Sequence, residues 1–311
     1  MNTRRTEVLS QPLQPPPGSG DAYTPQQILN AIEQGSLGKT SNSSGKTLGL
    51  AVSAGLSIAL GFAFFVTATT GMEDAPWGIS RLVGGAVFSL GLIVILVCGG
   101  ELFTSSILGC VPWATQRLET RRLLRNWLLV YLGNLAGALA LAGLVLTAKL
   151  HELAAGKWGI NVLEIAAHKL EHDFASAVAL GILCNVMVCL AVWMSHSTRR
   201  AGEKALLVIL PVALFVSTGF EHVVANMFIV PLALGIMHNV DAGFWQMTSH
   251  AGSAYEGITL SNFVLHNLIP VTLGNVIGGL LVGLGYWGLY GLVRPCAKPV
   301  LTPDLIDRQI H

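Results

Sequence analysis

Six long apolar runs divide this 311-residue chain and limit what it can fold into. They cover approximately residues 48–70, 82–110, 127–148, 175–195, 205–235 and 262–290. About 20 consecutive apolar residues are enough for one helix to cross the ~30 Å hydrocarbon core of a bilayer. The sequence therefore predicts an all-α integral membrane protein with six transmembrane helices.

The composition supports this prediction and excludes a nucleic-acid-binding protein. Charged residues make up only 11% of the chain and hydrophobic residues 52%, whereas a soluble domain has about 25% charged residues. A net charge of +1 provides no concentrated basic face for nucleic acid. The cysteines form no CxxC pair, so we interpret them as packing residues and expect no cofactor. They are Cys98, Cys110, Cys184, Cys189 and Cys296.

The distribution of Lys and Arg predicts the orientation of the chain in the membrane. Six spans place both termini on the same side, and basic residues favour loops on the cytoplasmic side. With both termini in the cytoplasm, only four of the 18 basic residues fall outside: Arg81, Lys149, Lys157 and Lys169. We therefore expect a multi-pass protein with cytoplasmic N- and C-termini.

The apolar runs also divide the chain into six segments. They are a polar, Pro-rich cytoplasmic leader (1–23), an N-terminal amphipathic helix and linker (24–47), a first three-helix repeat (48–148), an outer loop (149–174), a second three-helix repeat (175–292) and a cytoplasmic tail (293–311). The amphipathic helix is predicted over 24–38, with Thr24 as N-cap and Pro25 at its first position. It is interpreted either as a membrane-surface anchor or as a movable cytoplasmic gate. The first 20 residues receive no role.

Two pairs of runs resemble each other. Residues 126–139 and 267–280 are identical at seven of fourteen positions, including Asn126 with Asn267 and Gly133-Asn134 with Gly274-Asn275. The second and fifth runs echo each other more weakly, since each places an acid after glycine. Repeats of three spans must enter the membrane from opposite sides. The sequence thus predicts an inverted 3+3 repeat with its functional site near the midplane.

Ionisable side chains lie inside the second and fifth runs. Glu101, Glu221 and His222 would each cost at least about 2.5 to 3.5 kcal/mol in a membrane. Both helices are therefore predicted to break, so that these groups and unpaired amides face a cavity. The glutamates are interpreted first as partners for amides of the broken helix in their own half. His222 could bind or protonate a passing anion, or it could be a satisfied structural group.

Two features of the outer loop leave alternatives open. Lys169 is either a solvated surface residue or a cation that concentrates anions at the mouth of a pore. His168 and His172 are four residues apart, but no third ligand accompanies them, so no metal site is predicted.

Five motifs in these runs resemble those of the formate/nitrite transporter family. They are residues 88–92 (FSLGL), 101–105 (ELFTS), 185–193 (NVMVCLAVW), 219–228 (GFEHVVANMF) and 267–275 (NLIPVTLGN). The resemblance covers about residues 24–292 and is closest to the bacterial formate channels. It implies a homopentamer in the bacterial inner membrane, in which each aquaporin-like protomer has its own pore and an N-terminal helix can touch the cytoplasmic mouth.

The resemblance also implies roles for individual residues. Phe88, Leu92 and Phe215 would form a cytoplasmic constriction, and Leu102, Val188 and Phe215 would flank hydrophobic slits around a central chamber. Thr104 would approach His222, Asn275 would hydrogen-bond His222, and Lys169 matches the lysine of the outer vestibule. Glu101, Glu221, Asn185 and Asn226 are expected to be structural residues at the broken helices. Glu101 stands where the closest formate channels have Asp.

The implied function is pH-dependent transport of formate through the central histidine. The alternative is a nitrite or hydrosulfide channel of the same family, with acetate as a further candidate substrate and a cytoplasmic formate-producing enzyme as a candidate partner. A water or glycerol facilitator would need two Asn-Pro-Ala loops and a pore arginine, which the sequence lacks. A membrane enzyme would need more convergent ionisable groups than the spans offer. The sequence leaves open the physiological anion, the direction of flux, proton coupling and gating by the N-terminal helix.

Overall fold

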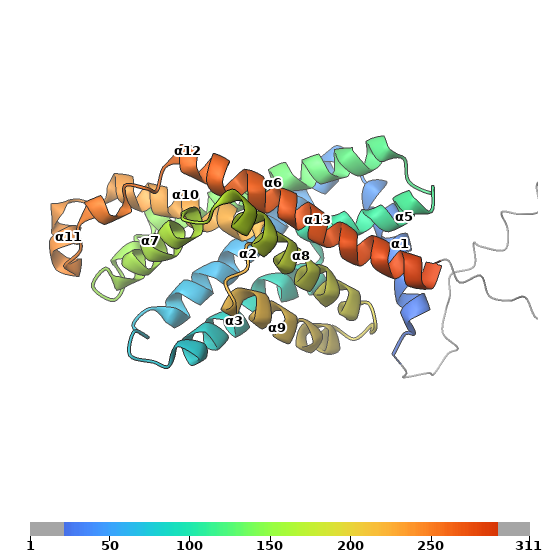
Figure 1. Ribbon diagram of the computed structural model, residues 1–311, viewed down its shortest axis with the longest axis horizontal. Helices are drawn as coiled ribbons and strands as arrows, with labels where there is room; N and C mark the ends of the chain where they lie inside the picture. The colour runs from blue at the N-terminus through green and yellow to red at the C-terminus, as the bar shows by residue number, and fades with distance from the viewer. Residues whose placement is uncertain (1–21, 292–311) are drawn as a thin grey trace, which may run out of the picture.

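The computed structural model describes residues 22–291, and all the regular secondary structure in this range is helical (Figure 1). The predicted cytoplasmic tail and all but the end of the predicted leader lie outside the described residues. The long helices are α2 (Ser44–Thr69), α3 (Trp77–Val94), α6 (Thr120–Thr147), α8 (Phe174–Ser195), α9 (Ala201–Ser217), α10 (Val223–Asn239) and α13 (Ile269–Tyr286).

Membrane-spanning length is reached by five helical stretches of residues 22–291. They are Ser44–Thr69, Trp77–Gly99, Thr120–Thr147, Phe174–Ser195 and Gly252–Gly291. The short helix α11 (Ala242–Thr248) is bent by 112° from α10, and this pair brings the number of candidate spans to six if it counts as one span. The prediction of an all-helical membrane protein is confirmed.

Both helices that were predicted to break are interrupted. In the first half, α3 continues into a π-helical turn, η1 (Ile95–Gly99), and the chain re-enters helix only at α4 (Phe103–Ser106), followed by η2 (Ile107–Gly109) and α5 (Cys110–Ala114). In the second half, α9 ends at Ser217 and α10 begins at Val223. Gly99 and Gly219 have φ values of +86° and +75°, which glycine adopts without the steric cost of a Cβ. Each glycine lies at the end of a helix, two residues before a glutamate.

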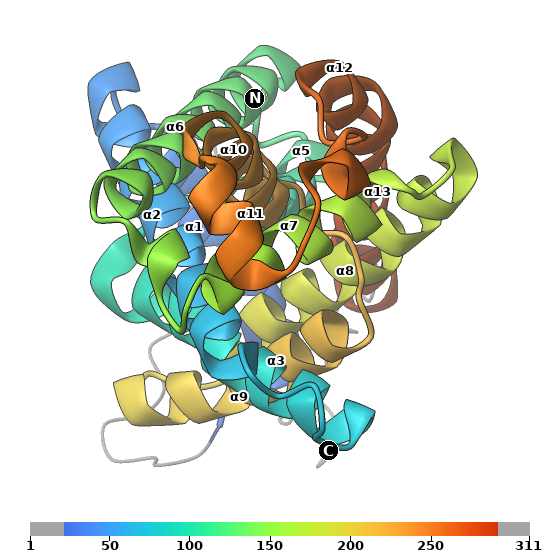
Figure 2. The ribbon, with the colours of Figure 1, turned by 90° about the vertical axis from the view of Figure 1, so that its left-hand side faces the viewer.

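Each half begins with a short helix ahead of its first long helix. The helix α1 (Pro25–Thr40) starts with Thr24 and Gln27 in a capping box and buries Ile28, Leu29 and Ile32. The helix α7 (Lys157–Leu170) precedes α8 and lies within the outer loop, for which the sequence predicted no helix. In Figure 1, α1 and α7 lie at opposite ends of the long axis, and Figure 2 views the molecule from the α7 end.

The helices α2 and α8 pack closely on α6 and α13, respectively, and glycines allow this. A Cβ at Gly137 would lie 2.2 Å from the Val52 carbonyl oxygen, and one at Gly278 would lie 2.4 Å from that of Ile182. The same close contact is therefore made in both halves. The remaining elements are η3 (Leu150–Glu152), η4 (Gly252–Tyr255), α12 (Leu260–Asn262), η5 (Phe263–Leu268) and η6 (Trp287–Gly291).

Candidate functional site

Two asparagines hold the two breaks with the same three hydrogen bonds. Asn134 Oδ1 accepts from the Phe103 amide at 2.8 Å, while its Nδ2 donates to the carbonyls of Ala51 and Glu101 at 2.7 and 2.9 Å. Asn275 Oδ1 accepts from the Val223 amide at 2.9 Å. Its Nδ2 donates to the carbonyls of Gly181 and Glu221 at 2.8 and 2.9 Å. Backbone groups freed by each break are thus paired away from lipid.

The glutamates accept hydrogen bonds from side chains and not from backbone amides of the breaks. This corrects the interpretation that they are partners for amides of the broken helices. Glu101 Oε2 accepts from Asn126 Nδ2 at 3.0 Å, and Oε1 accepts from Asn42 Nδ2 at 3.3 Å. Both glutamates are buried, with 1% of the residue exposed. A buried carboxylate requires such partners because desolvation penalises an unpaired charge.

Glu221 has a cation among its partners, which Glu101 does not have within 4 Å in the described residues. Lys169 Nζ lies 2.8 Å from Glu221 Oε1. Asn226 and Asn267 donate to Glu221 Oε2 at 2.6 and 3.2 Å. The Oδ1 atom of Asn226 is buried and has no hydrogen-bond partner among the described residues. Lys169 is therefore paired and only 13% exposed, unlike the freely solvated lysine of the first interpretation.

His222 caps the N-terminus of α10 through its ring. The Ala225 amide donates to His222 Nδ1 at 3.1 Å, so Nδ1 must be the unprotonated nitrogen. In the neutral ring the proton then lies on Nε2, which is 3.1 Å from Thr104 Oγ1. The predicted approach of Thr104 to His222 is present. The predicted hydrogen bond between Asn275 and the ring is absent, because Asn275 binds backbone groups of the break instead.

Asn185 connects the two halves behind this pair. Its Nδ2 donates to the Thr104 carbonyl at 3.1 Å and to the Asn275 carbonyl. Asn185 and Asn226 are both fully buried. The first fixes the segment that carries Thr104, and the second fixes the carboxylate of Glu221 next to His222.

A cavity of about 230 Å³ lies against His222. Its charged lining residues are Arg81, Glu164, Lys169 and Glu221, and its aromatic lining residues include Phe62, Phe65, Phe88, Phe215 and Phe220. The Phe215 ring is stacked on His222 with centroids 6.0 Å apart, and Phe88 meets Phe215 edge to face, also at 6.0 Å. The cavity therefore offers a charged region and an apolar wall to an ion that reaches the imidazole.

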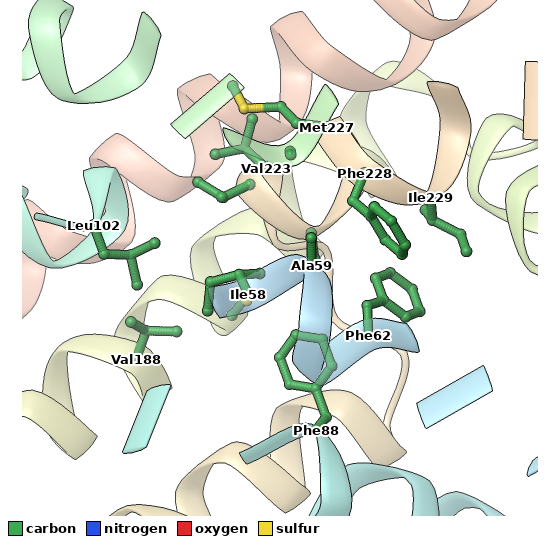
Figure 3. Packing of buried hydrophobic residues seen from close by; sticks show 14 of the residues in the cluster. Ile58, Ala59, Phe62, Phe88, Leu102, Val188, Val223, Met227, Phe228 and Ile229 are labelled. Carbon is green, nitrogen blue, oxygen red and sulfur yellow. The ribbon is translucent and has the colours of Figure 1, made fainter. Parts of the chain in front are cut away.

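The cavity lining corrects the side assigned to two of the constriction residues. Phe88 and Phe215 line the same cavity as Arg81 and Lys169, at the end predicted to be outside, and not a cytoplasmic constriction. Leu92, Leu102 and Val188 are buried and do not line this cavity. Figure 3 shows Leu102 and Val188 among the buried apolar side chains together with Phe62 and Phe88. Their roles as constriction residues stay predictions.

A smaller cavity, of about 50 Å³, lies at the α1 end. Ile32 and Lys39 of α1 line it together with Asn126 and His196. Glu33 of α1 also binds Arg117 and Thr115, at 3.0 and 2.6 Å. The N-terminal helix therefore covers the end of the molecule opposite to α7.

The sequence did not assign roles to several residues of this site. Asn126, Asn134 and Asn267 appeared only as matched repeat positions, Arg81 appeared only among the outer basic residues, and Asn42 was given no role. The matched asparagines were the signal, since polar identity between two apolar runs indicates a shared bond. Among residues 22–291, no three His, Cys, Asp or Glu side chains are placed to hold a metal ion.

Comparisons with known proteins place the chain in a family. The family model described as "Formate/nitrite transporter" matches residues 26–288. "Formate channel FocA" of Escherichia coli K12 is 47% identical over 271 residues, which are 87% of this chain and 95% of that protein. "Formate channel FocA" of Haemophilus influenzae is 43% identical over 263 residues, 85% and 93% of the two chains.

Solved structures give the same result. A structure titled "Pentameric formate channel with formate bound" matches with a TM-score of 0.74 and 45% identity over 79% of this chain and 97% of that chain. An "FNT family ion channel" matches with a TM-score of 0.70 and 26% identity over 84% and 98% of the two chains. With the broken helices, the paired asparagines and the cavity at His222, these matches identify the chain as a member of the formate/nitrite transporter family.

Proposed function

We propose that this protein is a formate channel of the bacterial inner membrane, with both termini in the cytoplasm. It moves formate and other small monovalent anions, and five protomers each provide their own pore. The observation that carries the proposal is the His222–Thr104 pair, 3.1 Å apart, beside a cavity walled by Phe88 and Phe215. The 47% identity to a formate channel and the formate-bound pentamer among the structural matches support formate and the assembly.

The geometry suggests the order of events for an entering anion. Arg81 and Lys169 line the cavity wall; because Glu221 binds the ammonium of Lys169, Arg81 is the cation that attracts an entering anion. The aromatic wall then removes water, which small and weakly hydrated ions tolerate best. His222 donates its Nε2 hydrogen to the anion, and the hydroxyl of Thr104, 3.1 Å from Nε2, donates its own hydrogen to the same anion. Leu92, Leu102 and Val188 form the apolar barrier beyond.

Hydrogen bonding is simpler than proton transfer for this ring. If Nε2 gave its proton to formate, Nδ1 would have to take one from elsewhere, yet Nδ1 already accepts from the Ala225 amide. Protonation at Nδ1 would therefore cost the cap of α10. We infer that the neutral ring stabilises the anion as a donor, and that proton-coupled passage requires the cap to open.

Flux into proteoliposomes tests the proposal. Formate, nitrite, hydrosulfide and acetate are compared in parallel at several pH values, with an internal pH indicator that reports any accompanying proton. We expect formate to be fastest, and the variants His222→Phe and Thr104→Val to reduce its flux about tenfold, the value of one hydrogen bond to a charged group. Thr104→Ser keeps the hydroxyl and serves as the matched control.

Two outcomes would contradict the proposal. Faster hydrosulfide or nitrite than formate would assign the other anion as the substrate. An unchanged rate and pH dependence in His222→Phe, with the pentamer intact by size exclusion, would remove the imidazole from the mechanism. Outward flux would need a cytoplasmic source of formate, so an enzyme that produces formate is the candidate metabolic partner.

A further inference from the structure

Each half has a similar group of three residues where its first short helix meets its first long helix: a lysine, a hydrogen-bond donor and an N-cap. Ser43 is the N-cap of α2 and Asp173 is the N-cap of α8. Four residues before each cap stands a lysine, Lys39 or Lys169, and directly before each cap stands a potential donor to the glutamate of the break. In the first half this donor is Asn42, whose Nδ2 donates to Glu101 Oε1 at 3.3 Å.

In the second half the equivalent donor is His172. Its Nε2 lies 3.8 Å from Glu221 Oε1, the oxygen that also binds Lys169 at 2.8 Å. The inverted repeat thus places a permanently neutral amide at one end of the molecule and a titratable imidazole at the other. An amide donates at any pH, whereas an imidazole becomes a charged donor only when it binds a proton.

The surroundings of His172 keep it neutral until the solution is acidic. Its side chain is 18% exposed, and burial is the largest effect, lowering the pKa of His172 below the usual 6.5. Glu221 and Glu171 oppose this shift, while Lys169 and His168 add to it. The His168 ring lies 5.3 Å from the His172 ring, and Asp173 is the next residue. Arg81 and Glu164 line the same cavity as Lys169 and Glu221.

Charge at this end of the molecule then depends on the proton. With neutral His172, the ammonium of Lys169 and the carboxylate of Glu221 balance each other at 2.8 Å. With protonated His172, one carboxylate faces two cations and the cluster gains a net positive charge. Lys169 and Glu221 line the cavity at His222, so this positive charge attracts an anion inside the cavity.

We propose that His172 is a positioning residue that adjusts the outer mouth to the pH of the outer solution. Protonated His172 takes Glu221 Oε1 in part from Lys169, and the ammonium of Lys169 turns toward the entering anion. The Asn42–Glu101 contact at the α1 end has no titratable donor, so this response belongs to the outer side, and His196 in the cavity at the α1 end has no part in it. This inference rests on the proposed function and on the predicted orientation.

Initial rates of formate entry test it in vesicles that hold the full chain in one orientation. The internal pH is fixed and the external pH is set to 7.5 or 5.5, with protein-free vesicles subtracted. The measured quantity is the rate of formate entry at external pH 5.5 divided by the rate at pH 7.5. We expect this ratio to be about threefold larger in wild type than in His172→Asn, the effect of one added positive charge near a partly hydrated cavity. In His172→Lys, which is charged at both pH values, formate should enter at both pH values at least as fast as it enters wild type at pH 5.5.

Matched variants separate this effect from structural damage. His172→Gln repeats the test in case His172→Asn does not assemble. His238→Asn is the control, because His238 is exposed in the last turn of α10 and does not line the cavity at His222. Its ratio should equal that of wild type.

The failures can be told apart. If wild type moves no formate, the proposed function is wrong. If wild type moves formate and assembled His172→Asn or His172→Gln keeps the wild-type ratio, the role of His172 is overturned while the function stands. A response of equal size to internal pH, again lost in His172→Asn, would also overturn it, because the effect would not be one-sided.

Discussion

The two halves hold their broken helices in the same way but fill the space behind each break differently. Asn134 and Asn275 make equivalent bonds, whereas the residue after the glutamate is Leu102 in one half and His222 in the other. The carboxylate of Glu101 binds two amides, and that of Glu221 also binds an ammonium. What the repeat duplicates is the scaffold, and the chemistry lies where the halves differ.

The largest expected effect tests the part that is the same. Replacing Asn134 or Asn275 with Leu leaves one backbone amide and one carbonyl of a break buried without partners, at about 1 to 3 kcal/mol each. We expect either variant to lose about 2 to 6 kcal/mol of stability, measured as thermal loss of the folded oligomer in detergent. Asn239→Leu is the control, since Asn239 makes one exposed bond to its own helix. Markedly unequal losses at Asn134 and Asn275 would break the equivalence.

The next effect tests the difference between the glutamates. Glu221→Gln leaves Lys169 as a poorly solvated cation without its counterion, which typically costs about 3 to 5 kcal/mol. Glu101→Gln removes no bonded cation and should cost about 1 to 2 kcal/mol, because the NH2 group of the new side chain would face the donating NH2 group of Asn126. The same thermal assay measures both. A larger loss of stability in Glu101→Gln than in Glu221→Gln would show that a cation compensates the charge of Glu101, although none lies within 4 Å of it among the described residues.

The smallest effect concerns the caps of α2 and α8. The Ser176 amide and hydroxyl, which both bind Asp173, lower the pKa of this exposed carboxyl below 3.8. Its contribution to stability is therefore complete above the unfolded value and is lost as the pH falls through the lower folded value. Asp173→Ser keeps a cap like Ser43 and should flatten the acid end of the melting-temperature profile by a small amount. An unchanged profile would show that the cap does not contribute at low pH.

Much of the scaffold could be predicted because it depends on patterns that the chain shows locally. Apolar runs long enough to span the membrane predicted the helices, and the ionisable side chains inside the second and fifth runs predicted both breaks. Thr24 and Pro25 gave the start of α1. The helix α7 was missed because an amphipathic segment between long apolar runs looks like an ordinary loop when only hydropathy is weighed.

The site was predicted less completely because its bonds join residues far apart in the chain. Asn42 and Glu101 are 59 residues apart, and Lys169 and Glu221 are 52 apart. No local pattern states that Asn275 binds the backbone and not the imidazole, or that Phe88 faces the Lys169 end. The tautomer of His222 follows only from the amide that caps α10 on it.

The attachment of each break has a mechanical consequence. Asn134 links its break to Ala51 of α2, and Asn275 links its break to Gly181 of α8. Each broken segment is therefore held to a long, continuous helix of its own half. A rocking of one half against the other would carry both kinks along undistorted. The strain would fall on the interface between the halves, where Asn185 donates to the Thr104 carbonyl and the hydroxyls of Tyr131 and Thr272 are hydrogen-bonded.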